Sequence, residues 1–265
     1  MELLHSLSTR ATPIKAALFD FDGTISTLRC GWESVMAPLM EETLRPGWQG
    51  GNLAGMVAGY IDKSTGIQTI FQMQWLARQV EAQGRTPLDP WEYKAEYNRR
   101  LMQSVEQRRR AVACGRESAG RYLISGSVQF LRALRERGIA LYVASGTDQA
   151  DVEAEAEILG VAGYFSEIAG APHHEASCSK DRVIRRLLGQ SGLAGEELVV
   201  AGDGKVEIAI AREAGALALG IASDEELRRG INPVKRKRLA EAGAHAIAGD
   251  FERLPELLAW LGLEG

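Results

Sequence analysis

Two aspartates, one residue apart, follow a short apolar run near the start of the chain. The run Ala16-Ala17-Leu18-Phe19 leads directly into Asp20 and Asp22. Continuous apolar runs of this length are typical of strands that are buried on both faces of a parallel sheet. Ligands bind in the crevice at the carboxyl ends of such strands. The sequence therefore predicts a reactive site at the end of this strand.

The spacing of the two aspartates restricts the path of the chain after the strand. Asp20 and Asp22 can face one crevice only if the chain leaves strand geometry after Asp20, and Gly23 permits such a departure. Carboxylates this close repel each other and are stabilised by a hard cation such as Mg²⁺. The alternative is an Asp-Gly turn that closes a hairpin, but the polar clusters described next favour the metal site.

Two later apolar runs, at residues 139–144 and 198–201, also end in polar residues. These polar ends are Ser145, Gly146 and Thr147 after the first run, and Asp203 and Glu207 after the second. Parallel strands bring such ends to one edge of a sheet, where they would meet Lys180 at the start of an expected helix. Together they supply a carboxylate nucleophile, a metal site, hydroxyl and amide donors and a cation, which are the parts that phosphoryl transfer requires.

The elements that must position these residues alternate between strand and helix. Strands are expected at 16–19, 139–144, 198–201, 216–221 and 244–248, and helices at 128–137, 148–159, 180–188 and 251–261. A further helix is expected to follow the third of these strands and to end at Gly215. This order predicts an α/β fold with a Rossmann-like parallel sheet that is covered by helices on both faces. Residues 1–13 are expected to form a loose lead-in.

Residues 26–120 show helical periodicity without a strand pattern. Four helices are indicated, and Asp89 followed by Pro90 marks the start of the fourth. An insertion of this length far exceeds an ordinary connection between a strand and a helix. We therefore expect a core domain formed by residues 1–25 and 121–265, and an all-helical cap domain formed by residues 26–120.

Composition excludes several classes of function. The chain has 265 residues, a formal net charge of −4 and a pI near 5.7, so nothing in its overall charge indicates nucleic acid or an anionic membrane as a partner. It has no apolar run of the ~20 residues that a membrane span needs, and no secretory signal pattern. Three cysteines at unrelated spacings suit a reducing compartment. We expect a cytoplasmic protein, either a monomer or a homodimer.

The four motifs, in this order, resemble those of the haloacid dehalogenase superfamily. The matching residues are Asp20-Phe21-Asp22-Gly23-Thr24, Ser145-Gly146-Thr147, Lys180 and Gly202-Asp203-x-x-x-Glu207. The resemblance implies that Asp20 attacks phosphorus to give an aspartyl-phosphate, and that Asp22 acts first as general acid and then as general base.

The resemblance also implies roles for the remaining motif residues. Ser145 and the backbone N–H of Gly146 would hold the phosphoryl oxygens, with Thr24 and Thr147 as further substrate-binding residues. Lys180 would neutralise Asp20 and the phosphate. The implied Mg²⁺ ligands are Asp20, Asp22 through its carbonyl, Asp203 and Glu207. Two features depart from many relatives: Glu207 stands where an Asp is common, and Lys180 lacks a following proline, so that Lys205 is a substitute candidate.

The implied activity is that of a Mg²⁺-dependent phosphatase of a small phosphorylated metabolite, of the sugar phosphate or phosphoglycolate type. An Asp two residues after the nucleophile resembles phosphatases and phosphomutases, and the position of the insertion resembles the caps of phosphoglycolate phosphatases and β-phosphoglucomutases. A phosphomutase of the β-phosphoglucomutase type is the alternative. A non-catalytic binding protein with the same fold is a third hypothesis, against which the intact acids argue.

Specificity is expected to lie in the cap. Residues 62–66 are predicted to open a helix, whose N-terminus beside a lysine could bind an anion, although simple helix capping is the alternative. Lys63, Thr65 and Gln68 are the candidates for substrate contact.

Other polar clusters favour structural explanations. His173, His174 and Cys178 could suggest zinc, but a solvated loop is favoured because adjacent histidines diverge and further ligands are lacking. The basic runs at 108–110 and 235–238 are predicted to be solvated helix faces rather than nucleic-acid contacts.

Overall fold

The computed structural model describes residues 1–4, 12–176, 179–190 and 192–264, with the side chains of Ser179 and Gln190 also left out of the description. Within these residues, seven strands form one sheet in the order β1-β7-β6-β5-β2-β3-β4. The strands are β1 (Glu2–Leu3), β2 (Ala16–Phe19), β3 (Ala140–Asp148), β4 (Glu167–Ala171), β5 (Leu198–Gly202), β6 (Leu217–Ile221) and β7 (Ala246–Ala248). All neighbouring strands are parallel except β1, which is antiparallel to β7.

The register of the central strands aligns the three polar ends. Phe19, the last residue of β2, lies opposite Val143 of β3 and Ala201 of β5. The chain therefore leaves β2 at Asp20 beside the end of β5 and the polar end of β3, as expected for parallel strands.

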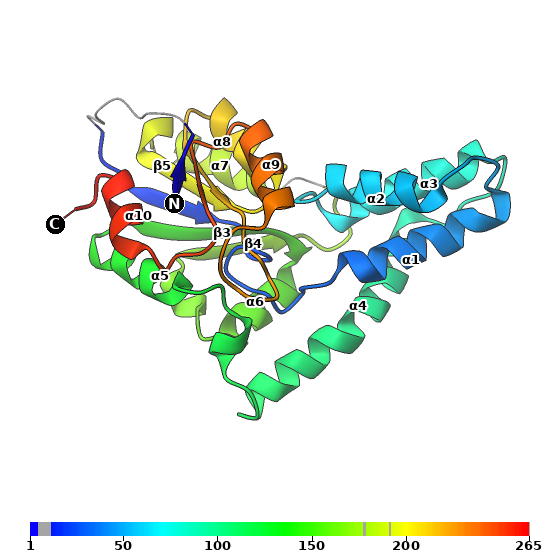
Figure 1. Cartoon of the computed structure of the whole chain (residues 1–265), viewed down its shortest axis with the longest axis horizontal. Coiled ribbons are helices and arrows are strands. Elements are labelled where there is room, and N and C mark those ends of the chain that lie inside the picture. The colour runs from blue at the N-terminus through cyan, green and yellow to red at the C-terminus, as the bar shows by residue number, and fades with distance from the viewer. Residues whose placement is uncertain (5–11, 177–178, 191, 265) are drawn as a thin grey trace.

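Helices cover both faces of the sheet, because the side chains of its strands are apolar on both sides. In β2, Ala17 and Phe19 belong to one hydrophobic cluster, while Ala16 and Leu18 belong to another. The first cluster includes side chains of α5 (Ser127–Glu136), α6 (Gln149–Ile158) and α10 (Leu254–Trp260), and the second includes those of α7 (Ser179–Gln190), α8 (Lys205–Glu213) and α9 (Pro233–Glu241). Figure 1 shows α7, α8 and α9 together on one side of the sheet and α5 and α6 on the other.

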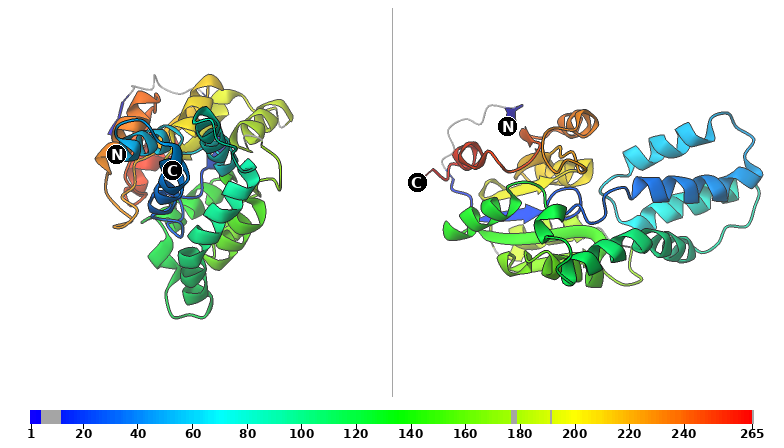
Figure 2. Two further views of the ribbon diagram at one scale, coloured as in Figure 1. Left: turned by 90° about the vertical axis from the view of Figure 1, so that its right-hand side faces the viewer. Right: turned by 60° about the horizontal axis from the view of Figure 1, so that its bottom comes forward.

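The inserted segment forms four helices, which we call the cap: α1 (Glu33–Leu44), α2 (Leu53–Lys63), α3 (Thr69–Ala82) and α4 (Pro90–Ala113). They share a third hydrophobic cluster, separate from the two in the core. Figures 1 and 2 show α1, α2 and α3 projecting from one side of the core, while α4 runs back along it. The predicted start of α4 is confirmed, since Asp89 Oδ1 accepts a hydrogen bond from the Trp91 N–H over 2.8 Å.

Several short 3₁₀ helices complete the described chain: Arg45–Gly47, Ala119–Tyr122, Ala162–Tyr164 and Gly195–Glu197. In the described part of the chain, no helix is both long enough and apolar enough to cross a bilayer.

The structure corrects the prediction in three places. The lead-in contains β1, whose residues Glu2 and Leu3 pair with Ile247 and Ala246, so the sheet is not purely parallel. Strand β4 was not predicted. The predicted helix start at residues 62–66 was wrong, because α2 ends at Lys63 and the next helix begins at Thr69. Lys63 therefore lies at the C-terminal end of a helix, whose partial negative charge does not attract anions.

Candidate active site

Three buried carboxylates gather where β2 and β5 end. Asp20 follows β2, Asp203 follows β5, and Glu207 lies in the first turn of α8. One carboxylate oxygen from each lies within 4.8 Å of those of the other two. Such a set of oxygen ligands is the kind that a hard divalent cation prefers.

A tight turn after β2 directs the second aspartate back towards the first. The Gly23 N–H donates to the Ser26 carbonyl over 2.8 Å, and the φ angle of Gly23 is +74°. A Cβ atom at Gly23 would lie 2.3 Å from Asp203 Oδ2, so only glycine fits both this conformation and this approach. The predicted departure from strand geometry is therefore present, and Asp20 and Asp22 line one cavity.

Lys180 joins two of these carboxylates. Its Nζ lies 3.0 Å from Asp20 Oδ2 and 2.9 Å from Glu207 Oε2. The other Glu207 oxygen accepts a hydrogen bond from the Gly204 N–H over 2.6 Å. Burial acts to lower the pKa of Lys180, but Asp20 and Glu207 outweigh burial and raise it. The lysine therefore carries a positive charge beside the Asp20 carboxylate.

Hydroxyl groups of the second motif hold the other aspartate. Thr147 Oγ1 donates to Asp22 Oδ2 over 2.8 Å, and Ser145 Oγ lies 3.4 Å from the same oxygen. Ser145 Oγ also accepts from the Thr147 N–H over 3.0 Å. Burial raises the pKa of Asp22, although Arg29 and the Thr147 hydroxyl oppose this increase. Burial therefore favours the protonated form of Asp22, which is the form that can give a proton to a leaving group.

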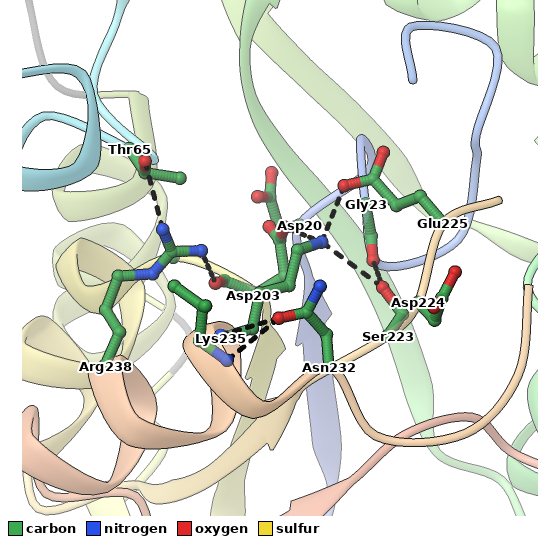
Figure 3. A network of polar contacts seen from close by, with 12 residues as sticks. Asp20, Gly23, Thr65, Asp203, Ser223, Asp224, Glu225, Asn232, Lys235 and Arg238 are labelled. Carbon is green, nitrogen blue, oxygen red and sulfur yellow. Dashed lines mark hydrogen bonds and ion pairs between the residues drawn. The ribbon is translucent and has the colours of Figure 1, made fainter. Parts of the chain in front are cut away.

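The basic run at 235–238 was predicted to be a solvated helix face, which is wrong for two of its four residues. Lys235 is buried, and its Nζ lies 2.7 Å from Asp203 Oδ2 and 2.6 Å from Glu225 Oε1. Arg238 donates to the Asp203 carbonyl over 3.1 Å and to Thr65 Oγ1 over 3.2 Å. Figure 3 shows both side chains pointing from α9 towards Asp203. They point inward because they are three residues apart on one face of the helix.

The run at 108–110 also departs from the prediction. Arg108 Nη1 donates to the carbonyls of Leu28 and Cys30 over 2.6 and 3.0 Å. Arg109 lies 3.5 Å from Asp151 of α6. Arg109 thus connects α4 to α6 of the core, and Arg108 connects it to the segment between β2 and α1, while Arg110 is exposed as predicted.

The turn between α2 and α3 lies directly over the acidic cluster. A Cβ atom at Gly66 would lie 3.0 Å from Glu207 Oε2, and one at Gly146 would lie 3.1 Å from the Ile67 carbonyl. Core and cap thus enclose one cavity, with α4 forming part of its wall. The cap and linker residues that line the cavity are Arg29, Trp32, Thr65, Gly66, Ile67, Thr69, Gln72, Lys94, Tyr97, Asn98 and Leu101.

The predicted site residues do not all reach this cavity. Those that line it are Asp20, Asp22, Ser145, Gly146, Thr147, Lys180, Asp203 and Thr65. Glu207 lies behind them, paired with Lys180. Thr24 and Gln68 are buried and Lys63 is exposed, and none of these three is among the lining residues. Lys205 is partly exposed at the start of α8, and Lys180 rather than Lys205 contacts Asp20.

Sequence reasoning missed several residues of the cavity wall. Lys94, Asn98 and Leu101 recur at helical spacing on α4, and Asp148 directly follows the second motif. This periodicity was available in the sequence, but it does not show which face of α4 meets the core. Arg29 was missed as well. It is buried, with its Nη2 2.7 Å from Glu155 Oε1 and 3.1 Å from Asp151 Oδ2.

The candidate zinc cluster gains no support from the described residues. His173 and His174 are exposed, and Cys178 lies outside the described residues. The His174 ring lies 4.7 Å from that of Trp91 on α4.

Comparison with known proteins gives a consistent result. Residues 14–215 match the family model of haloacid dehalogenase-like hydrolases. Over 144 residues, the chain is 26% identical to a phosphoglycolate phosphatase of Rhodospirillum rubrum, a match that covers 54% of this chain and 55% of the relative. The match therefore spans about half the length of this curated relative.

Solved structures share the fold at low sequence identity. A predicted phosphoglycolate phosphatase from Haemophilus somnus 129PT superposes with a TM-score of 0.60 at 18% identity, over 94% of this chain and 99% of that protein. CbbY from Rhodobacter sphaeroides, solved in complex with phosphate, superposes with a TM-score of 0.56 at 20% identity, over 91% and 96% of the two chains.

Proposed function

Because the chain belongs to the haloacid dehalogenase-like hydrolases, we propose that it is a Mg²⁺-dependent phosphatase that hydrolyses a small phosphorylated metabolite. The observation that carries this proposal is the pairing of Asp20 with Lys180, 3.0 Å apart, beside an Asp22 that accepts from Thr147. Burial raises the pKa of both aspartates, and Lys180 opposes this increase at Asp20 and so favours its carboxylate form. The two side chains would then supply a nucleophile and a proton donor for one phosphoryl group.

Asp20 is the proposed nucleophile. Its Oδ1 accepts from the Phe21 N–H over 2.9 Å, and its Oδ2 faces Lys180. These contacts fix the orientation of the carboxylate for attack on phosphorus, with formation of an aspartyl-phosphate and departure of the alcohol. Lys180 then balances the negative charge that Asp20 shares with the phosphoryl oxygens. Ser145 and Gly146 line the cavity, and we expect the Ser145 hydroxyl and the Gly146 N–H to donate to the same oxygens.

Asp22 is the proposed acid and base. In its protonated form it gives a proton to the departing alkoxide, and as a carboxylate it then accepts one from the water that attacks the aspartyl-phosphate. The Thr147 hydroxyl, 2.8 Å from Asp22 Oδ2, holds this side chain in place for both steps.

The residues present fit a divalent cation. Asp20 and Asp203 would hold Mg²⁺ together with the Asp22 carbonyl. Glu207, which completes the acidic cluster and accepts from Lys180 and the Gly204 N–H, would orient Lys180 beside the ion. When bound, such an ion neutralises charge on the phosphoryl group and on the crowded carboxylates.

The similarity to a phosphoglycolate phosphatase supports a phosphatase. A phosphomutase of the β-phosphoglucomutase type would use the same core residues, and a non-catalytic binding protein would keep the fold alone. A cytoplasmic location, a monomeric or homodimeric state, and the domain boundaries at residues 25 and 120 remain predictions.

A panel of phosphorylated metabolites, assayed for phosphate release with and without EDTA, tests the proposal. We expect metal-dependent release that is lowered about a thousandfold in kcat by Asp20→Asn. Isomerisation without phosphate release would establish a mutase instead. Turnover that survives both EDTA and Asp20→Asn would refute the mechanism.

A further inference from the structure

A polar trio from the core and the cap forms one wall of the cavity. Asp148 directly follows Thr147 of the second motif, while Lys94 and Asn98 are one turn apart on α4, and all three line the cavity. Lys94 Nζ donates to Asp148 Oδ1, and Asn98 Nδ2 donates to Asp148 Oδ2 over 3.1 Å. The trio therefore joins the motif that holds Asp22 to the cap helix that faces it.

We propose that Asp148, Lys94 and Asn98 bind hydroxyl groups of the leaving alcohol, so that the substrate is the monophosphate of a sugar or polyol rather than of an alcohol with a second anionic group. This inference rests on the proposed phosphatase function. The trio would bind the alcohol in the part of the cavity that the phosphoryl group does not occupy.

The charges along the cavity wall favour a neutral leaving group. Its lining includes three cations within the described residues, and each is already paired with carboxylates. The pairs are Arg29 with Glu155 and Asp151, Lys94 with Asp148, and Lys180 with Asp20 and Glu207. A carboxylate or second phosphate on the substrate would add negative charge to a lining in which the carboxylates already outnumber the cations. These carboxylates are Asp20, Asp22, Asp148, Asp203 and Glu225.

Hydroxyl groups fit the same wall without breaking a pair. A hydroxyl donates one hydrogen bond and accepts others, so it can donate to Asp148 and accept from Lys94 or Asn98. The lining adds neutral polar side chains, Thr69 and Gln72, on the α3 side. Trp32, Tyr97 and Leu101 provide apolar surface for the carbon chain of the alcohol.

The pairing also predicts how the preference can be reversed. Asp148→Asn keeps the size of the side chain and removes its negative charge, which leaves the Lys94 ammonium available to an anionic leaving group. Lys94→Met in the same chain removes that ammonium again. The double variant therefore tests whether an altered preference acts through Lys94.

The experiment measures kcat/KM for three substrates: the best member of a panel of C3–C6 polyol and aldose monophosphates, phosphoglycolate, and p-nitrophenyl phosphate, whose aryl group makes few polar contacts. We expect the wild type to favour the polyol or sugar phosphate over phosphoglycolate by about tenfold or more. Asp148→Asn should lower kcat/KM for the former about tenfold, and raise it for phosphoglycolate about threefold or more. The increase should be lost in the double variant.

Asp181→Asn, at a half-exposed position on α7 paired with Arg185, is the matched control and should match the wild type. A wild type that prefers phosphoglycolate, equal losses on all three substrates in Asp148→Asn, or an increase that persists in the double variant would overturn the assignment. Absence of Asp20-dependent turnover of p-nitrophenyl phosphate would instead overturn the phosphatase function itself, because that substrate does not need the trio.

Discussion

Arg238 of the core donates a hydrogen bond to Oγ1 of Thr65 in the cap over 3.2 Å. Its second terminal nitrogen donates to the Asp203 carbonyl over 3.1 Å, and the side chain is only 12% exposed. Figure 3 shows the guanidinium between these two partners. One side chain thus connects the acidic cluster at the end of β5 to the turn that covers the cavity.

Arg238→Met should weaken substrate recognition by loosening that turn. A hydrogen bond to a charged group contributes about 1.5–3 kcal/mol, so kcat/KM for the preferred metabolite should fall about tenfold or more. Steady-state assays measure the loss. Lys237→Met is the matched control, because Lys237 lies on the same helix with 78% of its side chain exposed. Equal activity in the two variants would show that the contact does not support catalysis.

Lys235→Met should make the folding stability of the protein depend more strongly on added Mg²⁺. Two lysines, Lys180 and Lys235, lie among five carboxylates around the site. Asp20, Asp203 and Glu207 are buried, and Asp22 and Glu225 are partly buried. Removing one partner of a buried ion pair costs about 3–5 kcal/mol, so the EDTA-treated variant should unfold at a lower temperature than the EDTA-treated wild type. Mg²⁺ should then raise its Tm by more than it raises the Tm of the wild type, because bound cation replaces the lost charge.

Thermal unfolding with EDTA and with Mg²⁺, for the wild type, Lys235→Met and Lys237→Met, checks this prediction. Identical Mg²⁺-induced shifts in all three proteins would contradict a charge-compensating role for Lys235.

The polar ends of three strands could be predicted because buried strands have a distinct pattern. Apolar runs that stop at Asp20, Ser145 and Gly202 indicate the strands, and parallel pairing brings their polar ends together. The predicted end at residue 144 was wrong, because β3 continues through Ser145 and Thr147 to Asp148. The start of α4 could also be predicted, because the capping residue Asp89 gives a distinct local pattern. Short elements could not be predicted in this way. Strand β1 has two residues and pairs with β7, which lies near the other end of the chain, so its formation depends on a tertiary contact.

Charged helix faces were the main limit of the sequence analysis. Four consecutive basic residues at 235–238 look solvated, because charge alone does not show that Lys235 and Arg238 face Asp203. The same difficulty hid Lys94, whose partner Asp148 lies 54 residues away. Lys63 was selected on a presumed helix start that the structure places at the end of α2. Lys94, Lys235 and Arg238 thus depend on which face of a helix meets the core, whereas Lys63 depends on where a helix ends.

Asp22→Asn should affect substrates according to their leaving groups. An alkoxide needs a proton when it departs, whereas a p-nitrophenolate is stable without one. The variant should therefore lose about a hundredfold or more in kcat/KM for an alkyl phosphate, and about tenfold for p-nitrophenyl phosphate. Equal losses for both substrates would indicate that Asp22 acts in orientation or metal binding rather than as the acid.

Glu155 should make stability fall as the pH rises towards neutrality. Its side chain is fully buried on α6 against Arg29, and burial raises the pKa of Glu155 to about 7 from 4.5, although Arg29 opposes this increase. Because the folded protein holds this proton more tightly than the unfolded chain does, the stabilising contribution is complete below pH 4.5 and is lost as the pH rises to about 7.

The free energy of unfolding of the wild type, minus that of Glu155→Gln, should therefore decrease across this window. Urea unfolding of both proteins at about pH 5 and about pH 8 measures the difference. A difference that increases with pH would mean that Arg29 holds Glu155 ionised throughout and that the ion pair, not the proton, stabilises this contact.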